Sequence, residues 1–122
     1  MAYIICDMPW GAIETEPEVY EWLTALTLPE FARATFYIDL LEAEGVHLDE
    51  PYSRQLRGKL RELRFYLGRQ QVRISYYIAT GRRIILLTVF AKQSRRETRE
   101  IERAETAMET CIREKHAAPE EA

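Results

Sequence analysis

Three consecutive segments in the middle of the chain alternate apolar and polar residues as β-strands do. Residues 60–67 and 71–79 each place apolar side chains at every second position, so each predicts a strand with one buried face and one polar face. Residues 83–90 are apolar on both faces and rich in β-branched residues, which is typical of a strand covered on both sides. Gly68 and Gly81 lie in the two connections. The run therefore predicts a three-strand antiparallel meander joined by tight turns.

Helices are predicted before and after this meander. Residues 15–18, 27–30 and 94–97 each have a Thr or Ser followed three residues later by Glu, a capping box that satisfies free amides at a helix start. We expect the second helix to end at Gly45. The third helix carries an apolar stripe of barely two heptads, so we expect it to pack on the sheet instead of forming a coiled coil. Residues 10–15 predict a first strand.

This order of elements predicts one α+β domain. A strand, two helices, the three-strand meander and a C-terminal helix would form a small antiparallel sheet with helices on one face. A length of 122 residues suits a single core. We expect the domain to span residues 9–115, with an N-terminal extension at residues 1–8 and a frayed tail at residues 116–122. The sheet face without helices would be open to a ligand.

The composition argues against several classes of protein. No apolar run approaches the roughly 20 residues that span a bilayer, and the first residues lack the basic segment of a secretory signal, so we expect a cytoplasmic protein that does not bind membranes. Cys6 and Cys111 lie far apart, and His47 and His116 have no partner at a metal-ligand or triad spacing. The chain also lacks a Gly-rich phosphate loop and a GxSxG motif. We therefore expect no metal or other cofactor.

The net charge of −3 hides a segregation of charge along the chain. Residues 1–51 contain eleven Asp and Glu and one Lys or Arg, whereas residues 52–103 contain fourteen Lys and Arg and four Asp and Glu. The balance is −10 in the first segment and +10 in the second. The surplus of cations coincides with the polar faces of the predicted strands. A basic surface of this kind suits an anionic ligand such as the phosphodiester backbone of nucleic acid.

The polar faces of the strands can support chemistry on RNA. The 2′-hydroxyl of RNA is an internal nucleophile held beside its own phosphate, so a protein need only orient it, stabilise the added negative charge and assist proton transfer. Arginine suits the charge-stabilising role, because its planar fork binds phosphate and stays protonated. The candidates for proton transfer are Glu62, Lys59, Lys92 and a tyrosine. The predicted RNA contacts are Arg57, Lys59, Arg61, Tyr77, Arg95, Arg96 and Arg99.

Three segments carry a family resemblance: GKLRELRFYLG at residues 58–68, VRISYYIATGRRIILLTVFAK at residues 72–92 and REIERAE at residues 99–105. Together they resemble the RelE/ParE superfamily of type II toxins, specifically its phage-derived HigB-like branch. The resemblance implies a RelE-like fold. For RelE and HigB members it also implies cleavage of mRNA on the ribosome, neutralised by an antitoxin that we expect to be a small helix-turn-helix protein. Position by position, the strand cations of the family match Arg64 and Arg73, and its cation after the last strand matches Lys92. The resemblance makes these three residues the catalytic candidates.

Two alternatives share this fold. A ParE-type toxin would bind and poison DNA gyrase without nuclease chemistry, although proteins of that type tend to lack the strand cations present here. A catalytically inactive member would act only as an RNA-binding or protein-binding module, and the acidic overall charge would suit such a role.

Overall fold

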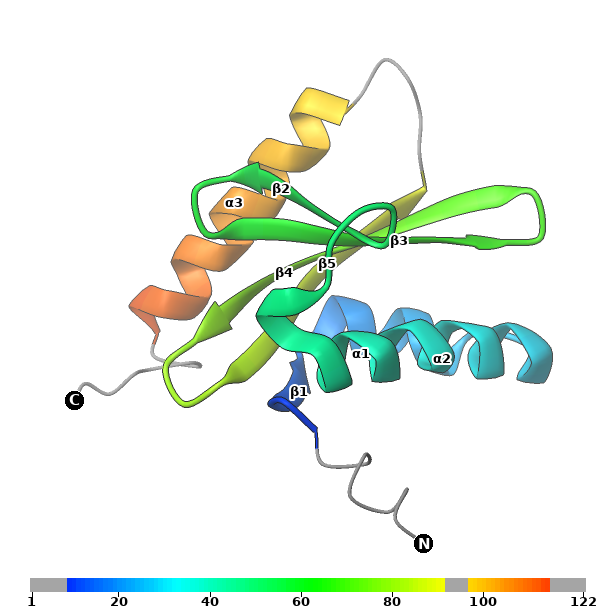
Figure 1. Ribbon diagram of the computed structural model, residues 1–122. Helices are drawn as coiled ribbons and strands as arrows, with labels where there is room; N and C mark the ends of the chain where they lie inside the picture. The colour runs from blue at the N-terminus through cyan, green and yellow to red at the C-terminus, as the bar shows by residue number, and fades with distance from the viewer. Residues whose placement is uncertain (1–8, 92–96, 115–122) are drawn as a thin grey trace, which may run out of the picture.

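A five-stranded sheet lies between helices on its two faces (Figure 1). The computed structural model describes residues 9–91 and 97–114. The strands are β1 (Ala12–Thr15), β2 (Ser53–Arg57), β3 (Leu60–Leu67), β4 (Gln70–Ala79) and β5 (Arg83–Ala91). The helices are α1 (Pro17–Thr24), α2 (Leu28–Glu44) and α3 (Glu97–Arg113), with a short 3-10 helix at Gly45–His47. Among the described residues, no helix is both long and apolar enough to cross a membrane.

Several sequence predictions concern residues outside the described ranges. The extension at residues 1–8 and the tail at residues 116–122 are two of them, so the domain boundaries stay predictions. The side chains concerned are Cys6, Lys92, Ser94, Arg95, Arg96 and His116.

The strands follow the order β1-β5-β4-β3-β2 across the sheet. The α+β class and the predicted meander are confirmed, because β3, β4 and β5 are antiparallel neighbours. β1 pairs in parallel with β5, so the sheet is mixed where an antiparallel one was expected. β2 extends the meander at its far edge and was not predicted. Its sequence, SRQLR, contains one apolar residue and therefore shows no alternation.

Each face of the sheet has its own apolar core. The core toward α1 and α2 includes Val19, Ala34, Ile38, Leu41, Leu63, Ile74, Tyr76, Ile84 and Leu86. The core toward α3 contains Leu60, Tyr77, Ile85, Leu87, Ala104 and Cys111. Successive residues of β5 thus enter opposite cores, as its apolar pattern predicted.

The expectation that helices cover only one face of the sheet is wrong. α3 lies on the face opposite α1 and α2 (Figure 1). On this face Ala104 and Cys111 belong to the same apolar cluster as Tyr77 and Ile85. The predicted docking of α3 on the sheet is confirmed. It occurs on this face because an amphipathic helix needs apolar surface, and the second face of β5 provides it. The polar side chains of the same face lie beside the first turn of α3.

Two of the predicted capping boxes fall on described residues. The box at Thr27 and Glu30 is present: Glu30 N donates to Thr27 Oγ1 at 3.4 Å, and Thr27 N donates to Glu30 Oε1 at 3.1 Å. The box at Thr15 is wrong, because α1 has Glu16 at its N-cap and no side chain caps it. Glu18 instead accepts hydrogen bonds from Val89 N of β5 at 3.0 Å and from an α3 arginine at 2.7 Å. A tertiary contact has replaced the local one.

Candidate functional site

A polar stripe crosses the α3-facing side of the sheet where β3 and β4 pair. Because side chains alternate along a strand, Glu62 and Arg64 of β3 share this face. On β4, the residue opposite Arg64 is Arg73, and the residue opposite Glu62 is Ser75. Two arginines therefore face each other across the strands. Like charges in this position are unfavourable unless an opposite charge lies near both.

Glu62 supplies that opposite charge. Its Oε2 accepts a hydrogen bond from Arg73 Nη2 at 2.8 Å and lies 3.4 Å from Arg64 Nε. Arg73 Nη2 also donates to Oε2 of Glu97, the first residue of α3, at 3.0 Å. The side chains of Glu62 and Arg73 are 0% and 1% exposed. We call Glu62, Arg64, Arg73 and Glu97 the arginine cluster; its two positive and two negative charges balance.

The arginine cluster contains buried polar atoms that have no hydrogen-bond partner. Among the described residues, no atom forms a hydrogen bond with Arg64 Nε, Arg73 Nε, Arg73 Nη1 or Glu62 Oε1. Buried donors and acceptors in folded proteins are nearly always satisfied by protein or water, and exceptions concentrate at functional sites. The cluster therefore contains three donors and one acceptor that no hydrogen bond within the described residues uses.

The guanidinium of Arg73 is held in its charged form. Burial lowers its pKa, but the hydrogen bonds to Glu62 and Glu97 outweigh that effect, so the pKa of Arg73 lies above its ordinary value. The guanidinium carbon also lies 5.4 Å from the centre of the Phe90 ring, within the distance of a cation–π contact. A group that stays charged at every physiological pH stabilises anions but does not exchange protons. The chemistry available to Arg73 is therefore electrostatic.

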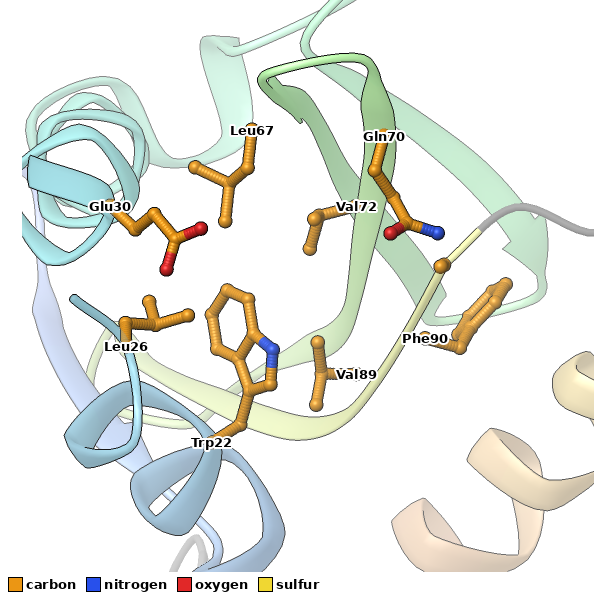
Figure 2. A pocket seen from close by; sticks show the side chains of 9 residues that line it. Trp22, Leu26, Glu30, Leu67, Gln70, Val72, Val89 and Phe90 are labelled. Atoms are coloured by element: carbon orange, nitrogen blue, oxygen red, sulfur yellow. The ribbon is translucent and has the colours of Figure 1, made fainter.

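An apolar cleft of about 340 Å³ lies on the other side of the sheet (Figure 2). Figure 2 shows Trp22 of α1 at its centre, between Val89 of β5 and Glu30 of α2. No lysine or arginine lines this cleft among the described residues, and Glu30 is occupied in capping α2. The described lining of the cleft therefore offers no positive charge to a phosphate ligand. No group of three or more His, Cys, Asp or Glu residues in the described part of the chain is arranged to hold a metal ion.

Comparison with known proteins identifies the family. Residues 21–109, more than half of the chain, match the model of a family described as Phage derived protein Gp49-like (DUF891). The chain belongs to the phage-derived Gp49-like family. A solved structure of E. coli toxin RelE, a double arginine-to-alanine mutant in the free state, matches this Gp49-like chain with a TM-score of 0.56 and 12% sequence identity. The match covers 84% of this chain and 98% of that chain. No curated protein sequence matches this Gp49-like chain.

The family match confirms the phage-derived branch of the resemblance, and the match to the solved structure confirms the RelE-like fold. The reaction and the residues that perform it are a separate question, which the placement of the predicted site residues addresses.

The Gp49-like fold brings together part of the predicted site. Arg64, Arg73 and Glu62 meet in the arginine cluster, as the strand pattern predicted for a shared face. Lys92, the third catalytic candidate, lies outside the described residues, as do two of the predicted RNA contacts. Glu97 was not predicted as a site residue. Its position in a capping-box motif suggested a local role, and only the packing of α3 places it beside Arg73.

Two predicted RNA contacts are not available to a ligand at this site: one is buried, and the other lies on the opposite face of the sheet. Tyr77 is buried under α3, where its hydroxyl donates to Cys111 Sγ at 3.3 Å, and burial raises the pKa of Tyr77. The prediction that Tyr77 faces a ligand is therefore wrong, because α3 covers its face of the sheet. Arg61 Nε donates to Ser53 Oγ at 3.1 Å, and that hydroxyl lies 2.5 Å from Tyr76 Oη in the core toward α2. Arg61 thus lies on the opposite face from Arg64.

The remaining predicted contacts on described residues form no hydrogen bond or ion pair with Glu62, Arg64 or Arg73. Arg57 forms an ion pair with Glu105 of α3 at 3.0 Å. Arg99 is exposed on α3. Lys59 is exposed in the turn before β3, five residues from Arg64, which corresponds to roughly 17 Å along an extended strand. Among the proton-transfer candidates, Glu62 lies with the arginines and Lys59 does not, while Lys92 lies outside the described residues.

Proposed function

We propose that this Gp49-like protein is the toxin of a type II toxin–antitoxin system and cleaves mRNA on the ribosome without a metal. The observation that carries the proposal is the pair of arginines that face each other on β3 and β4. Two nitrogens of Arg73 have no hydrogen-bond acceptor among the described residues, and Arg64 Nε has only the ion pair with Glu62 at 3.4 Å. A phosphodiester would satisfy these donors and would match their charge.

In the proposed reaction the scissile phosphate lies against Arg64 and Arg73. The 2′-oxygen attacks phosphorus, the bond from phosphorus to the 5′-oxygen breaks, and the products end in a 2′,3′-cyclic phosphate and a 5′-hydroxyl. The arginines stabilise the extra negative charge of the phosphorane. Electrostatic stabilisation by preorganised donors is usually the largest single contribution to catalysis. Glu62 keeps the Arg73 guanidinium oriented through its 2.8 Å hydrogen bond.

Glu62 is also the proposed acceptor of the 2′-hydroxyl proton. Its Oε1 has no hydrogen-bond partner among the described residues, while its Oε2 stays on Arg73. The leaving 5′-oxygen takes its proton from water in this scheme. A carboxylate in this role must be reached by the substrate, and Glu62 is fully buried. Substrate binding therefore requires Glu97 and the first turn of α3 to move away from Arg73.

One observation favours a second candidate function. Because Glu97 completes the charge balance of the arginine cluster, the cluster as it stands carries no net charge for an RNA phosphate to meet. This arrangement suits a binding module without nuclease activity. The ParE-type alternative, in which the protein poisons DNA gyrase, also needs no exposed cations. The three hypotheses differ in what expression does to a cell.

The test is expression without antitoxin, followed by mapping of mRNA ends. We expect growth arrest and fragments with 2′,3′-cyclic phosphate and 5′-hydroxyl ends. Arg64→Ala removes a phosphate donor from a partly exposed side chain and should reduce cleavage by about 10²-fold. Arg73→Lys keeps the charge beside Glu62 but loses the guanidinium donors, so cleavage should fall there too. Arg69→Ala, in the exposed turn of the same hairpin, is the matched control and should cleave normally.

Each rival outcome is distinct. Arrested cells with intact transcripts contradict the nuclease proposal, and DNA damage that survives Arg73→Lys indicates the gyrase alternative. Normal growth during expression indicates the inactive binding module. The expected partners are the ribosome, its mRNA and a small helix-turn-helix antitoxin, and the expected location is the cytoplasm.

A further inference from the structure

A second cleft, of about 350 Å³, opens at the edge of β3, next to the residues that precede β2. Its lining includes three tyrosines, two arginines and a glutamine: Tyr37, Tyr52, Tyr66, Arg33, Arg64 and Gln71. The volume is within the range of small-molecule sites, which begins near 300 Å³. Aromatic faces combined with guanidinium groups suit a planar anionic ligand, and the nucleotide is the commonest ligand of that kind.

The aromatic side chains of this cleft are arranged as a wall and two exposed rings. Tyr37 stacks on Phe65 with 5.0 Å between ring centres and 7° between planes, so these two rings form the wall. Tyr52 lies 6.1 Å from Tyr37 at 33°. Tyr66 is 51% exposed and Tyr52 is 40% exposed. Exposed tyrosine rings at the rim of a cleft are stacking surfaces for an unpaired base.

The polar lining includes a group that lacks a partner. Gln71 Oε1 is buried and has no hydrogen-bond partner in the described part of the chain, as is also true of Arg64 Nε. A side-chain amide can pair with the amino and carbonyl groups on the edge of a nucleobase. Arg33 holds the cleft together, because its Nε donates to the Tyr66 carbonyl at 2.6 Å and its guanidinium carbon lies 5.4 Å from the Tyr37 ring centre.

The cleft continues directly from the arginine cluster. Arg64 lines the cleft and contacts Glu62 of the cluster. Tyr66 follows Arg64 by two residues on the same strand face, and Gln71 is opposite Tyr66 and two residues before Arg73. Two residues along a strand correspond to roughly 7 Å, a distance that one extended nucleotide can span.

We infer that this cleft binds one unpaired RNA base adjacent to the phosphate at the arginine cluster. The base stacks on Tyr66, and its edge pairs with Gln71. The inference rests on the proposed function for the identity of the ligand, because an RNA substrate is what would place a base and a phosphate side by side. It adds a base subsite to a reaction otherwise proposed from charge alone.

The test is equilibrium binding of the full chain to fluorescein-labelled RNA trinucleotides, measured by fluorescence anisotropy. The RNA carries 2′-O-methyl groups so that it cannot be cleaved, and a second probe has an abasic site in the central position. We expect the abasic probe and the Tyr66→Ala variant each to weaken binding by about fivefold or more, since stacking contributes on the order of 1–3 kcal/mol per base. Tyr66→Phe should bind normally, because it keeps the ring.

The matched control is Tyr20→Ala on α1, a tyrosine that is 60% exposed and distant in the fold; it should bind both probes as the unaltered chain does. Equal affinity for the base-containing and abasic probes overturns the inference, as does the absence of saturable binding. Normal binding by Tyr66→Ala also overturns it and would leave an antitoxin segment as the ligand of these rings. Base-dependent binding without mRNA cleavage in cells would support the cleft and overturn the nuclease proposal. Cleavage in cells together with base-independent binding would support the nuclease proposal and overturn the base-binding cleft.

Discussion

Replacing Arg73 by alanine should destabilise the fold through the charge that it leaves behind. Glu62 is 0% exposed and would lose its 2.8 Å hydrogen bond, keeping only Arg64 at 3.4 Å. Breaking a buried ion pair by removing one partner costs about 3–5 kcal/mol. We expect a loss near the lower end, about 3 kcal/mol, because Arg64 remains and the Glu97 side chain, 31% exposed, can reach water.

The free energy of unfolding would be measured by urea denaturation followed by tryptophan fluorescence and circular dichroism. The double variant Arg73→Ala/Glu62→Gln removes the stranded charge and should recover at least about 1 kcal/mol relative to Arg73→Ala. Arg69→Ala, an exposed arginine in the next turn, should change stability by less than about 0.5 kcal/mol.

The reasoning would be refuted by an Arg73→Ala variant that loses less than about 1 kcal/mol, or by a double variant no more stable than the single one. Either result would mean that Glu62 is not held as a buried charge by Arg73. A confirmed loss has a consequence for the nuclease test, because reduced activity of Arg73→Ala would then include unfolding. Arg73→Lys, which keeps a positive charge beside Glu62, is therefore the sharper functional variant.

Three further predictions concern other parts of the fold. The hydrogen-bonded arginine of β5 lowers the pKa of Glu14 from its ordinary value, so Glu14→Gln should lose less than about 1 kcal/mol at neutral pH, and this difference should fade as the pH drops through the lowered pKa. Burial raises the pKa of the Cys111 thiol, so the folded chain should react slowly with iodoacetamide at this residue. Mass-spectrometric mapping should find alkylation of Cys111 at least about tenfold slower in the folded chain than in the urea-unfolded chain. Gly45 has φ +54°, and a Cβ there would lie 2.1 Å from Trp10 Cδ2, whereas Gly58 has φ +52° and nothing within 4 Å. Gly58→Ala should therefore lower the free energy of unfolding by about 1 kcal/mol through the backbone alone, and Gly45→Ala by at least about 2 kcal/mol more. Urea denaturation measures both losses, and equal losses would contradict the role of the tryptophan contact.

Local pattern was sufficient for most of the elements of this Gp49-like protein. The strands at residues 60–67, 71–79 and 83–90 agree with β3, β4 and β5 within a residue at each end. The pairing of Arg64 with Arg73 on a shared face follows from the same alternation, because a hairpin places its polar faces together. β2 was missed because its residues show no alternation.

Tertiary structure decided which side chains a ligand can reach. Alternation indicates that Arg73 and Tyr77 share a face, but it does not indicate what covers that face. α3 arrives from a distant part of the sequence, buries Tyr77 against Cys111 and places Glu97 3.0 Å from Arg73. Solvent exposure and charge balance depend on neighbours that are remote along the chain, whereas periodicity depends on neighbours that are adjacent. The sequence alone thus predicted where the arginines lie, and the packing of α3 placed Glu97 on Arg73 and completed the charge balance of the cluster.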